Sequence, residues 1–422
     1  MKLKFALFGM LIGLLTVGCS SDSEGEDNNN NSNNEPPVEI ALSRSQQDIV
    51  DSQGRLAFDF FRQTSEWAAT NVNLVISPLS LSIELAMLAN GAGEKTYNDI
   101  VSAAYLPNTT VEELNELYGK LVGEMISADH NVEFSMTNGI WTHKSLSLND
   151  RFVNNVKNYY TADIQSIDFH DRIGSLNTFN RWVSEKTKGS ISEVFNEYAN
   201  FRSTELIVCT ALSFNGKWTV PFDKKYTRSE NFTNIGDHNT KVDMMIAEAV
   251  SNTYSYVLTE IAEIIRLPYG NRTFSMYVIL PNIKDENYEK TYNRFIENLD
   301  YDWWVESKNQ MTYDNKPITV HLPKFNLPTL YGIGITPKDK FKDIILEPDM
   351  SLMTDANFNR VYIEQCNTIE VTESGTITAS ENKGELTNSP LATFVNVNRP
   401  FIFLIEEGST GAILFMGKVT KL

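Results

Sequence analysis

The segment from Glu370 to Pro400 constrains the fold of this chain more than any other feature. It begins as a strand, passes Gly375, and continues through mainly small and polar residues before apolar alternation resumes at Phe394. A connection of that length without a periodic apolar face is either disordered or functional. We interpret this segment as functional rather than disordered.

The N-terminal residues predict a targeting segment. Lys2 and Lys4 precede an apolar run, Phe5 to Val17, that is too short to span a bilayer. Small residues and Cys19 follow, and the pattern of residues 1–18 resembles a bacterial lipoprotein signal, which implies that Cys19 becomes the lipidated first residue. An ordinary secretory signal cut nearby is the alternative. We expect a lipid-anchored protein of the bacterial outer membrane, exposed at the cell surface.

Residues 19–39 are expected to form a solvated tether. The stretch from Ser20 to Val38 has no basic and almost no apolar residue, so it cannot bury a core. It resembles the acidic stretch of surface-exported lipoproteins in some Gram-negative bacteria. The whole chain has 36 basic and 54 acidic residues, a formal net charge of −18. The negative charge therefore disfavours nucleic acid and anionic surfaces as partners, and the lipid is the only expected membrane contact.

The remaining residues, 40–422, predict one large domain without catalytic chemistry. After Cys19 only Cys209 and Cys366 remain, so there is no disulfide framework and no metal-binding cysteine pattern. No histidine lies in an HExxH or GxSxG context; the five are His130, His143, His170, His238 and His321. We therefore expect no enzyme activity, no metal and no cofactor, and a hydrolase is the least supported class.

Local patterns predict several elements. An amphipathic helix is expected from Ser43 to Trp67, and another from Leu176 to Lys188, closed by Gly189. The run Leu206 to Phe214 is apolar, as in a strand covered on both faces. Such interleaved strands and helices indicate mixed sheets with helices packed on them.

A strand-to-helix junction is predicted at Ser77. The short apolar strand Leu74 to Ile76 meets Ser77 and Pro78, and a proline after a serine cap signals a helix start. A buried helix follows and stops at Gly91. Ser77 and Ser80 thus lie next to backbone groups that need partners, and capping alone would explain them.

From this junction onward the sequence resembles the serpin family. The family's motifs occur in order over nearly all of residues 40–422: NLVISPLSLSIELAML with GAGEKT, TNGIW (137–141), FNRWVSEKTKGSI (179–191), TALSFNGKWTVPF (210–222), KVDMM (241–245), LPYGNRTFSMYVILP (267–281), LPKF (322–325), EVTESGT (370–376), and NRPFIFLI with LFMGKV. The resemblance implies a mixed α/β (α+β) fold. It has a large central mixed sheet, two smaller sheets, eight or nine helices, and an exposed reactive loop at about 374–393.

The resemblance also implies a function. A serpin is a suicide substrate for serine proteases, with cysteine proteases as a further target class. The target attacks the loop, forms an acyl-enzyme, and is trapped when the cut loop inserts into the central sheet. We expect a monomer that inhibits such a protease. The alternative is a non-inhibitory serpin that acts as a cleavable binding protein.

Strand parity supports the inhibitory interpretation. The resemblance places the hinge at Glu373, Gly375, Thr376, Thr378, Ala379 and Ser380. With Gly375 as the pivot, insertion points Thr376, Thr378 and Ser380 inward, while the charged Glu381, Lys383 and Glu385 point outward. One inward charge could stall insertion. The family usually has alanines where Thr378 and Ser380 stand, so we expect slower insertion and a raised fraction of simple cleavage.

The family's usual spacing places the scissile bond between Ser389 and Pro390. Because a proline after the bond makes it a tertiary amide, the cut could instead follow Thr387, Asn388 or Leu391. These small or medium uncharged side chains favour elastase-like or subtilisin-like proteases.

The resemblance assigns the opening of the central sheet to Ser77, Ser80, Thr210, Gln365 and Trp218. The family commonly has asparagine at Thr210 and histidine at Gln365, which bond each other; here a hydroxyl and an amide could still pair. Cys209 and Cys366 adjoin these positions. Two buried thiols are the favoured interpretation, and a disulfide that locks the sheet is the alternative. A thiol count on unfolded, unreduced protein decides between them.

Overall fold

The computed structural model describes residues 35–422 except for positions 190, 196, 198, 200, 202, 237, 284–286, 312–316, 329–332, 335–340 and 376–391. The signal segment, Cys19 and most of the expected reactive loop therefore lie outside the described residues.

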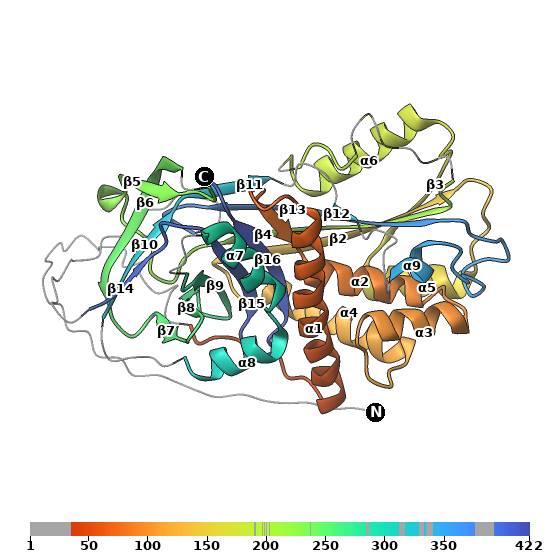
Figure 1. Ribbon diagram of the computed structural model, residues 1–422. Coiled ribbons are helices and arrows are strands. Elements are labelled where there is room, and N and C mark those ends of the chain that lie inside the picture. The colour runs from red at the N-terminus through yellow and green to blue at the C-terminus, as the bar shows by residue number, and fades with distance from the viewer. Residues whose placement is uncertain are drawn as a thin grey trace, which may run out of the picture.

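Three sheets form the framework (Figure 1). The central sheet has the order β11-β13-β4-β2-β3, with β12 also paired to β13. Its pairs are mixed, because β4–β13 and β2–β3 are parallel while β2–β4 and β11–β13 are antiparallel. Its strands are β2 (Val132–His143), β3 (Asp163–Ile167), β4 (Leu206–Gly216), β11 (Phe325–Pro328), β12 (Ile333–Gly334) and β13 (Val361–Val371).

The second sheet has the order β1-β16-β15-β9-β8-β7, and the third has the order β14-β10-β6-β5. Every residue of β9, β15 and β16 is buried, so the second sheet lies in the core. The strands are β1 (Leu74–Ile76), β5 (Arg228–Thr233), β6 (Asn239–Val250), β7 (Ser255–Leu258), β8 (Ala262–Pro268), β9 (Phe274–Pro281), β10 (Ile318–Pro323), β14 (Thr393–Asn396), β15 (Phe401–Glu407) and β16 (Ile413–Val419).

Nine α-helices are present among the described residues. This confirms the predicted mixed fold with three sheets. The helices are α1 (Arg44–Trp67), α2 (Pro78–Ala89), α3 (Glu94–Ala103), α4 (Val111–Ser127), α5 (Asp150–Tyr160), α6 (Arg172–Lys186), α7 (Tyr288–Glu297), α8 (Tyr301–Asn309) and α9 (Lys342–Ile345). In the described part of the chain, none of them combines the length and apolar character that crossing a membrane requires.

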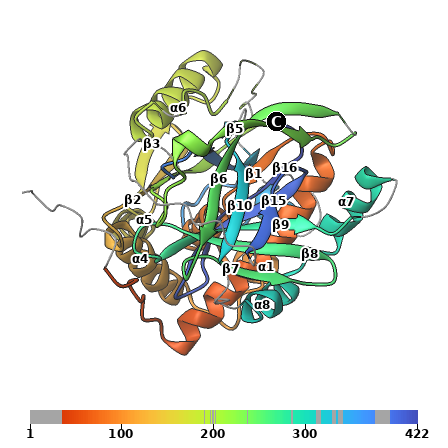
Figure 2. The same ribbon diagram turned by 90° about the vertical axis from the view of Figure 1, so that its left-hand side faces the viewer.

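The helices cover the central sheet from two sides, as Figures 1 and 2 show. Helix α2 is buried along its whole length and contacts β4, β13 and β16, so it lies between the central and second sheets. Helix α6 lies on the opposite face of the central sheet. There it forms a separate apolar cluster with Trp141 of β2 and Ile207 of β4.

The helix starts follow local capping chemistry. Ser43 caps α1 in a reciprocal box with Gln46, and Ser77 caps α2 ahead of Pro78, as the sequence predicts. Helix α6 begins at Arg172, earlier than the predicted Leu176. The reason is Asp171, whose carboxylate accepts a hydrogen bond from the Gly174 N–H at 3.0 Å and starts the helix there.

Candidate functional site

The predicted hinge follows β13 and folds back against the end of β4. Thr372 and Gly375 bond each other's backbones, and Gly375 forms a bridge with Lys217. Gly375 has φ of +142°, and a Cβ added to it would lie 2.0 Å from the carbonyl oxygen of Gly216. Both the backbone conformation and the lack of space restrict this position to glycine.

Trp218 holds the hinge from the side. Its backbone N–H donates to the Ser374 carbonyl at 3.0 Å, and its indole N–H donates to the Thr372 carbonyl at 2.9 Å. The indole is buried and stacks on Tyr269, with 4.4 Å between ring centroids. Trp218 thus lies at the hinge, and its role in loop entry stays a prediction.

Glu373 is a buried and fully partnered hinge residue. Its Oε1 accepts from the Thr227 hydroxyl at 3.0 Å, and its Oε2 lies 3.2 Å from the Lys324 ammonium. Burial favours the neutral acid, but hydrogen bonds from its own backbone N–H, Lys324 and Thr227 outweigh it and hold the pKa of Glu373 below its usual value. The hinge is therefore anchored by an ionised carboxylate.

The remaining hinge and scissile predictions lie outside the described residues. They are Thr376, Thr378, Ala379, Ser380, Thr387, Asn388, Ser389, Pro390 and Leu391. The chain is described again from Ala392, and β14 then pairs in parallel with β10 of the third sheet. The predicted loop thus connects the central sheet to the third sheet.

Thr210 of β4 and Gln365 of β13 lie opposite each other at the seam between these strands. Other contacts take the place of the hydroxyl–amide pair that the sequence allowed. The Thr210 hydroxyl donates to Asn138 Oδ1 at 2.9 Å, since Asn138 lies opposite it on β2. Gln365 instead bonds the backbone N–H and carbonyl of Ser77 at 3.0 and 2.8 Å, which ties β13 to the start of α2.

The two predicted serines lie directly beneath the seam. The Ser77 hydroxyl accepts from the Ser80 N–H at 3.2 Å and donates to the Leu414 carbonyl at 2.8 Å. The Ser80 hydroxyl is buried and has no hydrogen-bond partner within the described part of the chain. The structure therefore gathers Ser77, Ser80, Thr210 and Gln365 in one region, although their role in sheet opening stays a prediction.

Glu84 of α2 reaches the same seam, and the sequence analysis did not single it out. Its Oε1 accepts a hydrogen bond from the Thr210 N–H at 2.8 Å. At the two ends of β4, the Lys217 N–H donates to the Asn131 carbonyl and the Glu205 carbonyl accepts from the His143 N–H. The backbone N–H and C=O groups of odd-numbered residues in this strand therefore point toward β2. The Thr210 N–H therefore faces β13, and the Glu84 carboxylate takes the place of a strand acceptor.

A signal for Glu84 was present in the sequence. Helix α2 is so apolar that the sequence predicts it to be buried, and Glu84 is its one acidic residue. Such a residue needs a specific partner, which here lies 126 residues away in the chain.

Two carboxyl groups at the seam favour their protonated forms. Burial raises the pKa of Glu84 well above its usual value, and the charges of Cys209 and Glu364 add to this shift. Burial also raises the pKa of Glu364 to about 8, although Arg360 opposes it. Ionisation of Glu364 would therefore add a negative charge to the seam at about pH 8.

The register separates the two cysteines. Cys209 lies opposite Glu364, whereas Cys366 lies opposite Ala211. Strands about 4.8 Å apart with a two-residue offset place such Cα atoms about 8 Å apart. A disulfide requires Cα atoms closer than about 7 Å. This geometry disfavours the lock, although the Cys366 side chain lies outside the described part.

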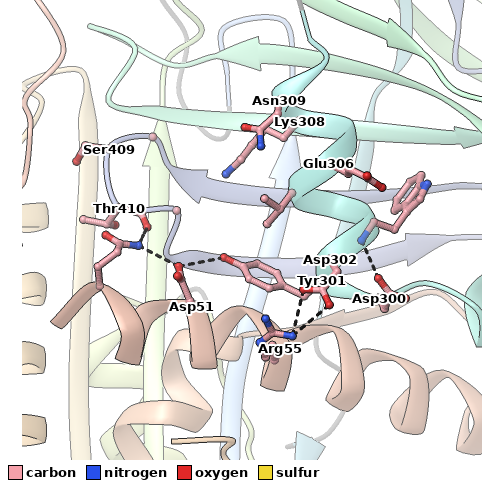
Figure 3. Close-up of a pocket in the computed structure, with 15 residues that line it drawn as sticks. Asp51, Arg55, Asp300, Tyr301, Asp302, Glu306, Lys308, Asn309, Ser409 and Thr410 are labelled. Carbon is pink, nitrogen blue, oxygen red and sulfur yellow. Dashed lines mark hydrogen bonds and ion pairs between the residues drawn. The ribbon is translucent and has the colours of Figure 1, made fainter. Parts of the chain in front are cut away.

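A groove of about 790 Å³ lies between α1, α8 and the turn that joins β15 to β16 (Figure 3). Both acidic and basic side chains line this groove. Arg55 pairs with Asp302 at 3.1 Å, and the Tyr301 hydroxyl donates to Asp51 at 3.5 Å. These side chains bond one another across the groove, so it is polar and open.

Comparisons with known proteins agree with this geometry. Residues 51–422 match the family model described as Serpin (serine protease inhibitor). An uncharacterized serpin-like protein of Methanosarcina acetivorans is 30% identical, and the match covers 99% of this chain and 97% of the relative. A leukocyte elastase inhibitor of Xenopus laevis is 28% identical, covering 86% of this chain and 97% of that protein.

A solved structure supports the same fold. Human thyroxine-binding globulin superimposes with a TM-score of 0.76 at 21% identity, over 89% of this chain and 99% of the other. Together with the family model, which covers most of its length, these findings establish that this chain belongs to the serpin family.

Proposed function

We propose that this protein is a suicide-substrate inhibitor of serine proteases rather than an enzyme. The arrangement that carries the proposal is the direct parallel pairing of β13 with β4, with the hinge after β13 held at the end of β4. A cleaved loop that reverses at Gly375 would run antiparallel to β13. It could then enter the seam as a strand between β13 and β4.

Pairing energetics favour this insertion. Parallel ladders are slightly less stable per residue than antiparallel ladders. An inserted strand would replace the parallel β4–β13 ladder with two antiparallel ladders. It would also supply backbone acceptors for amides such as Thr210 N–H, which now bonds the Glu84 side chain. Both effects favour the inserted state, which is the direction that a kinetically trapped native state requires.

The experiment is incubation with an elastase-like and a subtilisin-like protease. We expect an SDS-stable complex together with a cleaved band, because Thr378 and Ser380 bring hydroxyls into the inserted strand. Mass spectrometry of the released C-terminal peptide locates the cut among Thr387, Asn388, Ser389, Pro390 and Leu391. Cleavage without complex at every ratio contradicts the proposal.

The second candidate is a cleavable binding protein without inhibitory action. The groove between α1 and α8 favours it, since thyroxine-binding globulin has the same fold and its solved structure holds thyroxine. Thermal melting before and after loop cleavage separates the candidates. A large upward shift indicates insertion, whereas an unchanged melting temperature favours the binding protein.

We also propose a lipid anchor at Cys19 on the outer surface of the bacterial cell, which rests on the sequence of residues 1–39. Cys19→Ala is expected to release the protein from the membrane fraction. Digestion of intact cells with an added protease tests whether the domain faces outward. Retention of the variant in the membrane fraction argues against the anchor.

A further inference from the structure

A cluster of two histidines and one aspartate lies outside the hinge and the seam. His143 ends β2, while Asp168 and His170 lie in the turn between β3 and α6. His143 Nε2 and His170 Nδ1 are 3.2 Å apart, and Asp168 Oδ1 lies 3.8 Å from the first and 3.4 Å from the second. Three potential ligand atoms from two segments therefore face one point.

We propose that His143, Asp168 and His170 bind a divalent transition metal ion of the Zn²⁺ type. Zinc binds imidazole nitrogen at about 2.0–2.1 Å and carboxylate oxygen at about 2.0–2.2 Å. With the three measured separations, a point equidistant from the three atoms lies about 2.0 Å from each. An ion displaced slightly toward solvent would keep all three ligands in range and complete its coordination with water.

The donor set selects the class of metal. Two imidazoles and one carboxylate suit Zn²⁺, Co²⁺, Ni²⁺ or Cu²⁺, whereas Ca²⁺ and Mg²⁺ prefer sites made only of oxygen. A hydrogen bond between the two imidazoles would explain their 3.2 Å contact alone. Asp168 Oδ1, which the His170 N–H holds within 4 Å of both nitrogens, adds a third ligand atom that this hydrogen bond does not involve.

Neighbouring groups orient the ligands. The Ser145 hydroxyl lies 2.7 Å from His143 Nδ1. When Nδ1 carries the ring proton and donates a hydrogen bond to this hydroxyl, Nε2 has a free lone pair for the metal. The Ser145 N–H donates to the same Nδ1 at 3.3 Å only when the ring proton is on Nε2, so metal binding through Nε2 would break this bond and keep the contact in which Nδ1–H donates to the Ser145 hydroxyl. Asp168 Oδ1 is positioned by the His170 N–H at 3.0 Å.

One neighbour opposes the metal. The Lys144 ammonium lies 2.6 Å from Asp168 Oδ2, so it attracts part of the negative charge that would stabilise the cation. Lys144→Met is therefore expected to raise the metal affinity severalfold. The same change should leave the three ligand positions in place, because Lys144 is exposed and its backbone pairs with Ile167.

The location gives the ion a structural effect. Helix α6 lies over β2 and β4 through Trp141, Phe179 and Trp182, and its cluster reaches Tyr362 of β13. A metal between the end of β2 and the turn before α6 would fasten this helix to the central sheet. Bound metal should therefore raise the melting temperature of the protein.

The test is calorimetric titration of Zn²⁺ into the tag-free full chain after treatment with a chelator. We expect one ion per chain, at least tenfold weaker binding in His170→Ala, and unchanged binding in His238→Ala, which removes another exposed histidine. Because the His170 side chain is exposed, the variant should fold normally, which circular dichroism checks.

A spectroscopic arm separates binding at this site from unspecific binding. Co²⁺ bound by the two imidazoles and the carboxylate should give the visible d–d absorption of a four- or five-coordinate ion. This absorption should be absent in His170→Ala. The proposal is overturned if the wild-type chain shows no saturable binding below millimolar Zn²⁺. It is also overturned if His170→Ala and His238→Ala bind with equal affinity.

Discussion

The hinge and the seam differ in how well their buried polar groups are satisfied. At the hinge, both carboxylate oxygens of Glu373 have partners, in Thr227 and Lys324. At the seam, Oε1 of Glu84 bonds the Thr210 N–H, while the buried Oε2 has no hydrogen-bond partner within the described residues. The hinge is therefore stabilised, whereas the seam retains an uncompensated desolvation penalty.

This difference suits the proposed insertion, in which the native state opens once and in one direction. The contacts of Glu373 have to break before the hinge can move, so they raise the barrier to insertion. The unpartnered oxygen of Glu84 destabilises the closed seam, so it lowers the free energy needed to part β4 from β13. If the loop inserts as proposed, the hinge would control the timing of insertion and the seam would contribute part of its driving force.

The largest expected effect comes from a charge placed on the path between the two regions. Thr378→Arg points a charge inward on insertion, which costs several kcal/mol, whereas Ala379→Arg points it outward. We expect at least a tenfold loss of SDS-stable complex for the first variant, with cleavage intact, and near-normal complex for the second. Equal losses in the two variants would refute the predicted parity.

The second effect is a dependence of stability on pH that arises at the seam. The folded pKa of Glu364 is raised to about 8, so between its unfolded value and pH 8 the native state binds more protons than the unfolded state. Stability is then fully present at about pH 4–5 and is lost as pH rises toward 8. This shift of the Glu364 pKa changes the free energy of unfolding by about 3–5 kcal/mol over that pH range.

Urea unfolding between pH 5 and 8 measures this loss. Glu364→Gln should flatten the profile, and the raised pKa of Glu84 adds in the same direction. Lys418, whose pKa burial lowers to about 8, stays protonated in both states over most of this range and contributes little slope. A variant with the wild-type slope would show that Glu364 is not the source.

The third prediction tests the fit of the hinge. Gly375→Ala introduces a Cβ where φ is +142° and where that Cβ would lie 2.0 Å from the Gly216 carbonyl oxygen. We expect it to destabilise the native state by about 1–3 kcal/mol. Gly123 in α4 has open space around it, so Gly123→Ala should stabilise the protein by about 0.5–1 kcal/mol. Opposite signs in urea unfolding support the hinge geometry; equal signs contradict it.

What the sequence could predict depended on the range of the interactions involved. The start of α2 at Ser77 and Pro78 and the buried strand β4 follow from neighbouring residues, so they were predictable. The number of sheets, three, was predicted from the family motifs, because the periodicity of apolar residues alone does not determine it. The Glu84–Thr210 bond joins residues far apart in the chain, and no local pattern encodes it.

The same reason explains the other differences. The sequence allowed a bond between Thr210 and Gln365, but Asn138 on β2 bonds Thr210 instead, because the β2–β4 register places Asn138 directly opposite. His143 and His170 were judged separately because they lie 27 positions apart in the chain, and the parallel pairing of β2 with β3 brings them together. Side-chain contacts across strands thus required the structure.

The smallest predicted effect concerns the anchor of the hinge. Glu373→Gln keeps the size of the side chain but removes the charge that Lys324 and Thr227 stabilise, so we expect a loss of about 1–2 kcal/mol in the free energy of unfolding. The lowered pKa of Glu373 means that this contribution is present above the usual glutamate pKa and is lost as pH falls through the folded value. Asp223→Asn breaks an exposed pair with Lys225 and should have no measurable effect on the free energy of unfolding.

The rate of conversion during warming gives a second test of the hinge. If Glu373 holds the hinge, Glu373→Gln should convert spontaneously to an inserted, inactive form faster than wild type, while Asp223→Asn should not. Unchanged rates of both variants would mean that Trp218 and the backbone contacts alone retain the hinge.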